Sequence, residues 1–499
     1  MKNWSISFAD VDRQSFASKV GNGFMDYRDF FDFEPSIEGI EKAKKSKVLS
    51  LELRNTLVNV LNNQYETWGI PLPGQVNQLL KEDVFTVTTG HQLNFLSGPH
   101  FFFTKIAATI HLAKMLGEAC IPVFWLASED HDFDEIASTI LYGKTIQFAP
   151  EYSNAPVGRL KMTRSWMEEI QKAMEYISSP WAKTLIQESY QEGFPLSKCI
   201  ARLVHACFGK FGLLIVDGDS QELKSRAFAL FEREWKEQIL SKSVETQNKV
   251  LSNYGLEPQV YHRDINLFKI NDLNRIRINK GDHDFLQLKP EEISPNALMR
   301  PLFQETILPN LAYIGGAAEV AYWAQLKIAF SAFNVQMPVV LLRPSLFFVD
   351  PKHLLWLEKW GWKFNDVFSD EQALIKRLIH QQPDQFFAEP FIIDLNSMEQ
   401  HAREQIEKID PTLLATLGSE VEKMKGLWRG LEKKVEKAIK QKQEIEVQRI
   451  GKIKNMLFPD QVFQERKTNG FQFIHQESQI EELIEILNPI HPQIHAFLV

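Results

Sequence analysis

The stretch VFTVTTGHQLNFLSGPHFFFTKIAATIHLAKML, residues 84–116, with IPVFWLASEDHDFDE, residues 121–135, decides the fold of this chain. A β-rich apolar run ends at a glycine, and a loop, a helix with apolar periodicity and a second apolar strand follow. This order is half of a nucleotide-binding α/β unit. Ligands of open parallel sheets bind outside the carboxyl ends of the strands, so the loops 90–98 and 128–135 are expected to meet at one crevice.

Three further apolar runs extend the predicted sheet, so that five parallel strands are expected to start at Val84, Val123, Leu213, Ala312 and Val339. The fold class is therefore α/β, a Rossmann-like parallel sheet with connecting insertions, plus a C-terminal α-helical coiled-coil domain. We expect the core to span 1–380, with insertions at about 145–210 and 220–295. Residues 381–460 would form the helical domain, and 461–499 would pack back on the core.

The helical domain carries apolar residues at 3-4 spacing, which is typical of a coiled-coil seam: Val421, Met424, Trp428, Leu431, Val435 and Ala438. A helix of this length does not bury such a stripe alone. It either forms an intramolecular hairpin with residues 398–417 or pairs with a second subunit, and we favour a homodimer.

Composition excludes several classes of protein. The 499 residues hold 56 Lys and Arg against 64 Asp and Glu, a net charge of −8, which disfavours nucleic acid as a partner. The three cysteines show no CxxC spacing, so no zinc site is predicted. Neither an export signal nor a membrane span is recognisable, and we expect a cytoplasmic protein.

Glycines frame two predicted anion sites at helix starts. Gly90 and Gly98 let backbone amides approach an anion, and Pro99 suits the first position of the following helix. Gly315 and Gly316 precede a second helix, with Glu319 near its positive end. The alternative is an ordinary strand-to-helix connection, since neither GxGxxG nor a P-loop is present. Arg343, just past the last strand, is a candidate for phosphate or carboxylate binding, or else for a surface ion pair.

The acidic loop is the sharper signal, because five carboxylates surround His131: Glu129, Asp130, Asp132, Asp134 and Glu135. Such a cluster is costly unless a cation or an amine binds nearby. It predicts binding of Mg²⁺ or of a substrate ammonium group, with His131 as a base. The alternative is a solvated loop in which Asp132 or Asp134 caps the next helix.

A third group of polar residues comprises Asn296, Arg300 and Gln304, which would share one face of a helix. Pro301 is expected to break a helix there, so we predict an irregular segment that lines the crevice.

KMTRS, residues 161–165, looks like the KMSKS loop of class I aminoacyl-tRNA synthetases, but it lies in an insertion and no HxGH motif accompanies it. An RNA-binding relative of the synthetases is therefore disfavoured.

Several long segments occur in series from DYRDFFDF, residues 26–33, to the late LFPDQVFQER, residues 457–466. Between them stand TTGHQLNFLSGPHFFFTK, PVFWLASEDHDFDEI, SPNALMRPLFQETILP, YIGGAAEVAYWAQL and VVLLRPS. On these segments the chain resembles the bacillithiol-biosynthesis cysteine-adding enzyme family, the cysteine ligases, over essentially its full length. Many members are expected to have TGQQ where this chain has Thr89-Gly90-His91-Gln92. We therefore expect Gln92 and the glycines, and not an imidazole at His91, to be essential.

The resemblance implies a ligase that joins the carboxyl of cysteine to the glucosamine amine of glucosaminyl-malate. It also implies ATP as cosubstrate and a homodimer formed through the coiled coil, while Mg²⁺ is a candidate ion because of the acidic loop. Amide formation requires activation of the carboxylate to an acyl-adenylate or an acyl-phosphate. The glycines and Arg343 would stabilise phosphates, His131 or a neighbouring carboxylate would accept the amine proton, and Asp130 and Asp132 would hold the ammonium or sugar hydroxyls. The remaining substrate-binding candidates are Gln92, Lys105, Glu129, Asn296, Arg300, Gln304 and Tyr322, with Arg300 or Lys105 facing a malate carboxylate.

Two rival functions stay open. The first is another ATP-dependent ligase that joins an amino acid to an amine. The second is a nucleotide-binding coiled-coil scaffold without catalysis, against which the electrostatic cost of the acidic loop argues.

Overall fold

The computed structural model describes residues 3–11, 19, 26–150, 154–281, 285–381 and 386–498. The chain forms two compact units, of which the first comprises the residues up to Phe348 together with Val462–Leu498. The second comprises Val349–Gln461. The sequence analysis drew the boundary at 380, whereas the contacts assign helices α15 (Pro351–Trp360) and α16 (Glu371–His380) to the second unit.

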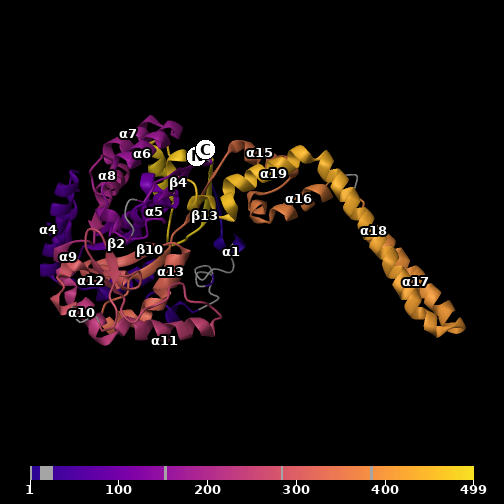
Figure 1. The fold of residues 1–499 in the computed structure, drawn as a ribbon, viewed down its shortest axis with the longest axis horizontal. Helices are drawn as coiled ribbons and strands as arrows, with labels where there is room; N and C mark the ends of the chain where they lie inside the picture. Colours follow the sequence, from indigo (N-terminus) through magenta and orange to yellow (C-terminus); the bar gives the residue numbers. More distant parts are fainter. Residues whose placement is uncertain are drawn as a thin grey trace. The chain divides into compact units, whose positions relative to one another are not determined.

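A five-stranded parallel sheet forms the centre of the first unit, in the order β11-β10-β2-β3-β6 (Figure 1). Every pairing is parallel; Thr88, for example, lies between Val123 on one side and Tyr313 on the other. The predicted strands and the Rossmann-like class are confirmed. The strands are β2 (Phe85–His91), β3 (Cys120–Leu126), β6 (Leu214–Asp217), β10 (Asn310–Gly315) and β11 (Val339–Leu342).

The sheet is buried because helices cover both of its faces, as parallel connections require. All seven residues of β2 and all seven of β3 are buried. The predicted helix after the glycine loop is α5 (Phe101–Leu116), which packs on β2 and β3 and is buried along most of its length. The helices α3 (Ile37–Ser46), α4 (Leu51–Trp68) and α13 (Ala317–Trp323) also contact strands of the sheet. The same unit contains α12 (Met299–Ile307), α14 (Lys327–Phe333) and α20 (Glu477–Ile486), of which α20 packs on α5.

The first insertion contains a hairpin of β4 (Ser138–Leu141) and β5 (Lys144–Gln147) and three helices, α6 (Arg164–Tyr176), α7 (Pro180–Ser189) and α8 (Leu196–Phe208). Residues Val157–Arg159 of this insertion form a 3-10 turn.

The second insertion begins with three helices, α9 (Gln221–Arg226), α10 (Phe228–Glu237) and α11 (Ile239–Asn253). A small antiparallel sheet follows, made of β7 (Leu267–Ile270), β8 (Arg275–Arg277) and β9 (Ile293–Pro295). At the C-terminus, β13 (Ile494–Leu498) lies between β1 (Asn3–Ile6) and β12 (Ser345–Val349), which joins the end of the chain to the first unit. The short helix α1 (Phe8–Val11) follows β1.

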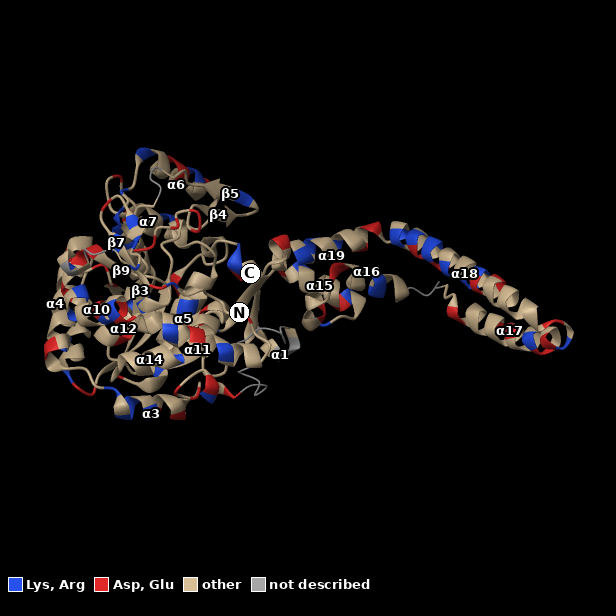
Figure 2. Ribbon diagram, turned by 60° about the horizontal axis from the view of Figure 1, so that its bottom comes forward, with Lys and Arg blue, Asp and Glu red and all other residues tan. Residues whose placement is uncertain are grey.

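The second unit is helical, and its longest helices, α17 (Glu389–Ile409) and α18 (Leu414–Lys442), run side by side as a hairpin (Figure 1). Trp428 of α18 stacks on Phe391 of α17 with ring centroids 4.3 Å apart, and Val421 is buried. Met424 and Leu431, from the same predicted seam, stay exposed. The hairpin therefore covers only part of the apolar stripe. Charged residues of both signs are spread along α18 (Figure 2), and α19 (Glu444–Leu457) follows.

Within the described residues, no helix is both long enough and apolar enough to cross a membrane.

Candidate functional site

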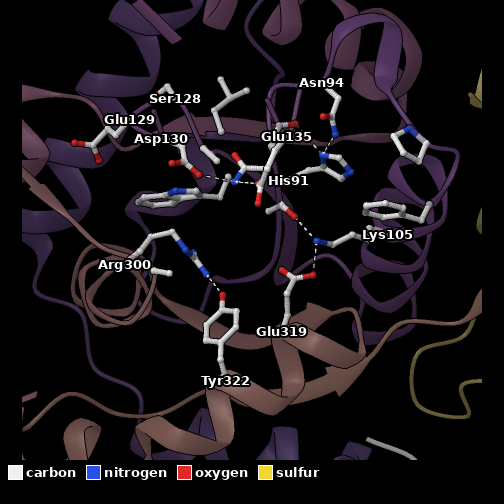
Figure 3. Close-up of a pocket in the computed structure, with 18 of the residues that line it drawn as sticks. His91, Asn94, Lys105, Ser128, Glu129, Asp130, Glu135, Arg300, Glu319 and Tyr322 are labelled. Atoms are coloured by element: carbon white, nitrogen blue, oxygen red, sulfur yellow. Dashed lines mark hydrogen bonds and ion pairs between the residues drawn. The ribbon is translucent and has the colours of Figure 1, made fainter. Parts of the chain in front are cut away.

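A cavity of about 730 Å³ opens at the carboxyl ends of β2, β3 and β10 (Figure 3). The structure thus brings together the segments that the sequence analysis expected to meet at one crevice. From the predicted site residues, the lining includes Gly90, Gln92, Pro99, Lys105, Glu129, Asp130, Asn296, Arg300, Glu319 and Tyr322.

Lys105, which is buried, and Glu319, which is partly buried, form an ion pair on one wall of the cavity, with 2.7 Å between Nζ and Oε2 (Figure 3). Lys105 also donates to the carbonyl oxygen of Gly90. Burial alone would raise the pKa of Glu319, but the charge and hydrogen bond of Lys105, with further donors, lower it to about 2. The cavity wall therefore carries a fixed pair of opposite charges.

The predicted anion cradle at Gly315-Gly316 already holds a carboxylate of the protein. The Gly316 amide donates to Glu319 Oε2 at 2.9 Å, and Tyr313 donates to Oε1 at 2.6 Å. Neither glycine is among the residues that line the cavity. The helix start thus binds its own Glu319, as an N-terminal carboxylate does in a capping box, rather than presenting free amides to a substrate.

Arg300 projects from α12, a regular helix where an irregular segment was expected. Pro301 is its third residue, inside the first turn, where the backbone amides have no intrahelical partner and a proline is tolerated. Arg300 donates to Gln304 Oε1 at 2.8 Å and to the hydroxyl of Tyr322 at 3.0 Å. Gln304 is fully buried and outside the cavity lining, so it orients Arg300 rather than facing a substrate.

The carboxylates of the acidic loop point in different directions. Asp130 faces the cavity and accepts from Gln92 Nε2 at 2.5 Å, with Arg275 Nη1 at 3.5 Å. Burial alone would raise the pKa of Asp130, but the His131 hydrogen bond and the Arg275 charge hold it well below its usual range. Glu129 pairs with Lys224 at 2.7 Å, while Asp132 and Asp134 are exposed. Internal cations therefore relieve much of the repulsion that the sequence suggested.

His131 does not line the cavity. Its Nδ1 lies 3.0 Å from Nη1 of Arg275, and its ring packs near Phe268. The same Nδ1 lies 3.5 Å from Oδ1 of Asp130, so the ring contacts the Asp130–Arg275 pair instead of the cavity. This geometry speaks against His131 as the base and leaves the role to a neighbouring carboxylate.

Glu135 is the carboxylate that the sequence analysis did not select. It lines the cavity, and its Oε2 accepts from Gln92 Nε2 at 3.2 Å. Burial raises the pKa of Glu135, and the charges of Asp130 and Asp132 raise it further. A general base works best when its pKa lies near the working pH. Glu135 is itself exposed, and what distinguishes it from Asp132 and Asp134 is its place at the cavity. Membership of the acidic loop was the only signal in the sequence, because the order of residues in a loop does not tell which side chain borders a cavity.

His91 is a buried, neutral residue of the cavity wall. Burial, with the charge of Lys105, lowers its pKa to about 3. Its Nδ1 lies 2.8 Å from the carbonyl oxygen of Gln92, which fixes the proton on Nδ1. Nε2 is a buried acceptor without a hydrogen-bond partner among the described residues.

Gly98 shapes the loop between β2 and α5, with φ +61° and ψ −149°, a conformation that is essentially restricted to glycine. A Cβ atom there would lie 2.5 Å from Cβ of Asn94.

Pro99 lines the cavity, but α5 begins two residues later, at Phe101, so the predicted position of Pro99 as the first residue of the helix is wrong.

We expect Gly98→Ala to lower the free energy of unfolding by about 1–3 kcal/mol, because it adds backbone strain to the clash with Asn94. Urea denaturation followed by circular dichroism measures this. Gly117→Ala is the control: its φ is +85°, yet a Cβ there would meet no atom within 4 Å. Equal losses in the two variants would contradict the role of the close contact.

Arg343 has a partner inside the protein, Glu465. Its Nη1 and Nη2 lie 2.8 and 2.7 Å from the two carboxylate oxygens, and the two side chains are 5% and 2% exposed. Arg343 is also absent from the cavity lining. The structure thus gives this guanidinium a structural ion pair in place of a substrate anion.

No cluster of three or more His, Cys, Asp or Glu side chains able to hold a metal ion occurs within the described ranges. Magnesium is commonly bound by one or two carboxylates together with substrate phosphates. A magnesium ion therefore stays a prediction that depends on a bound substrate.

Comparison with known proteins agrees with this architecture. The family model for the N-terminal Rossmann-like domain of bacillithiol biosynthesis BshC matches residues 1–344, and the model for its C-terminal coiled-coil domain matches 346–497. The protein named "Putative cysteine ligase BshC" from Christiangramia forsetii is 33% identical, over 92% of each chain. That from Flavobacterium johnsoniae is also 33% identical, over 97% of this chain and 98% of its own.

A solved structure of the tryptophanyl-tRNA synthetase of Plasmodium falciparum is 14% identical over 88% of this chain and 99% of its own, with a TM-score of 0.19, too low to carry an argument. The two domain models cover almost the whole sequence in the expected order. The chain belongs to the BshC family of bacillithiol biosynthesis, with the Rossmann-like and the coiled-coil domains of that family both present.

Proposed function

We propose that this protein is a ligase that joins the carboxyl group of cysteine to the amine of glucosaminyl-malate, with ATP as cosubstrate. The observation that carries the proposal is the mixed charge of one cavity in a member of the BshC family. Asp130 and Glu135 supply carboxylates on one side, and Lys105 and Arg300 supply cations on the other. Such a site suits an amine nucleophile and an anionic partner held close together.

The residues present are compatible with a nucleotide. The cavity volume lies in the range of small-molecule sites. Arg300 and Arg275 line it, and guanidinium groups match phosphate geometry. ATP supplies the activation that makes a carboxylate an acyl donor. The chain itself would orient the two substrates and accept the proton that the amine releases when the amide bond forms.

Within the cavity, Asp130 is held ionised and suits the ammonium group of cysteine. Glu135, whose pKa is raised, suits the transfer of the amine proton. Lys105 already donates to Glu319 and to the Gly90 carbonyl. Its role would be to fix the shape and charge of the cavity wall, and not to bind a free anion.

The test is incubation of purified protein with ATP, cysteine and glucosaminyl-malate, followed by mass spectrometry of the thiols. We expect bacillithiol, and the nucleotide product distinguishes adenylation from phosphorylation. Product with other amines or amino acids but none with this pair would favour a different ligase. Nucleotide binding without any product would favour a scaffold. In a deletion strain, loss of bacillithiol with accumulation of its cysteine-free precursor is the matching result.

We also propose a homodimer formed through α18. Met424, Leu427 and Leu431 follow one another at 3-4 spacing on this helix and are 45%, 75% and 42% exposed. An apolar stripe on a helix that is already paired with α17 suits a further helix partner.

The double variant Leu427→Glu/Leu431→Glu is expected to be a monomer in light scattering coupled to size exclusion, because two buried carboxylates would oppose the interface. Lys433→Glu is the control, an exposed position on the side of the same helix that faces away from this stripe, and it should leave the mass of the wild type unchanged. A wild-type protein with monomer mass at micromolar concentration would contradict the proposal.

A further inference from the structure

A segment far from the sheet in sequence contributes to the cavity. The chain re-enters the first unit at Val462, and four and five residues later Arg466 and Lys467 line the cavity beside residues of β2 and β3. The sequence analysis assigned no role to either residue. The site therefore includes two basic side chains that no strand of the parallel sheet supplies.

The backbone that carries Arg466 is fixed by the two residues before it. Gln464 is fully buried, and its side chain accepts from the Phe348 amide at 2.8 Å and donates to the Phe348 carbonyl at 3.0 Å. Glu465 is buried and accepts from Arg343, from Ser345 Oγ at 2.9 Å and from the Leu346 amide at 3.1 Å. Such a network holds a short 3-10 turn, residues Gln464–Arg466, in one place.

Arg466 differs from the other cations of the cavity in having an available guanidinium. Lys105 is paired with Glu319, and Arg300 donates to Gln304 and Tyr322. Arg275 donates to Ser294 Oγ at 3.1 Å and to the Pro295 carbonyl at 2.7 Å. Arg466 is exposed, and its guanidinium makes no hydrogen bond or ion pair with the described residues; only its backbone amide donates, to the Phe463 carbonyl.

Most exposed arginines are simply solvated. Two features set Arg466 apart: it lines the cavity, and a buried polar network fixes the turn on which it stands. A guanidinium presents a planar set of donors that matches a carboxylate or a phosphate in two parallel hydrogen bonds. Its fixed backbone reduces the entropy that binding would cost.

We propose that Arg466 is the residue that binds an anionic group of a substrate in this cavity. The inference rests on the proposed ligase function, in which two substrates carry such groups: the malyl dicarboxylate of the sugar acceptor and the phosphates of the nucleotide. Both present the same chemistry to a guanidinium, and binding measurements separate them.

The experiment is calorimetric titration of the full-length protein with glucosaminyl-malate and, separately, with ATP and Mg²⁺. Arg466→Gln is expected to weaken binding in one of the two titrations by about 10- to 100-fold, the usual effect of losing hydrogen bonds to a charged group. Arg466→Lys should restore part of the affinity, because it keeps the charge without the planar fork. Arg164→Gln is the control, an exposed arginine of α6 that lies outside the cavity and pairs only with Glu168.

A loss confined to glucosaminyl-malate, with glucosamine bound equally by both proteins, would identify the malyl group as the anion. A loss confined to ATP would identify the phosphates. Unchanged affinity in both titrations, or no binding of either compound to the wild type, overturns the proposal. Thermal melting of each variant separates lost binding from lost folding. Calorimetric titration measures binding without catalysis. A wild type that binds these compounds but forms no bacillithiol would therefore contradict the ligase function and not the role of Arg466.

Discussion

Replacing Arg343 with methionine is expected to lower the free energy of unfolding by about 3–5 kcal/mol, because it leaves the carboxylate of Glu465 buried without its cation. The two side chains are 5% and 2% exposed, so water cannot substitute for the lost partner. Ser345 and the Leu346 amide would still donate to Glu465, but neither carries a charge. Urea denaturation followed by circular dichroism measures the difference.

The double variant Arg343→Met/Glu465→Gln should regain part of the lost stability, because no unpaired charge stays buried. Burial alone would raise the pKa of Glu465, but the charge and hydrogen bonds of Arg343 lower it from its ordinary 4.5. A lowered folded-state pKa means that the pair stabilises the protein fully above the unfolded pKa of Glu465 and loses this effect as the pH falls through the folded pKa. The wild type and Arg343→Met should therefore differ most at neutral pH and converge in acid. A constant difference at all pH values would contradict the ion pair as the cause.

Glu135→Gln is expected to reduce kcat of the proposed ligase reaction by about 10²–10⁴-fold, the usual contribution of a general base. The substitution keeps the size of the side chain but removes its ability to accept a proton. Asp134→Asn is the control, because it neutralises the adjacent carboxylate, which is exposed and does not line the cavity. Quenched-flow or steady-state assays of amide formation give kcat directly.

The pH profile provides a second measurement of the same role. A base must be deprotonated, so activity should rise with pH through the pKa of Glu135, which burial and the charges of Asp130 and Asp132 raise above its ordinary value. The acidic limb of the wild-type profile should disappear in Glu135→Gln. Loss of turnover in His131→Ala, with Glu135→Gln still active, would return the role of base to His131.

The parallel strands could be predicted because each is a short apolar run that ends at a glycine or at polar residues. The crevice followed from a general property of such sheets, namely that the carboxyl ends of neighbouring strands lie at one edge. The family resemblance rests on the same segments. The local sequence was therefore sufficient to predict the sheet and the position of the site.

Details that depend on distant partners could not be predicted in this way. Arg343 looked available because Glu465 lies 122 positions away in the sequence. Gly316 looked like an anion cradle because the ion pair that holds Glu319 beside it comes from Lys105 of α5, 214 positions away in the sequence. Pro301 was misjudged because the start of α12 was unknown, and a proline is harmful only beyond the first turn.

The hydrogen bonds from Gln464 to both backbone groups of Phe348 have a topological consequence. Phe348 is the last residue before the helical unit, and Gln464 follows shortly after the chain returns from it. Their hydrogen bonds hold the exit and the return of the chain side by side in the first unit. Lengthening the inserted segment would add little loop-closure entropy, because that cost grows only with the logarithm of the length. A longer or shorter helical unit would therefore leave the geometry of the first unit unchanged.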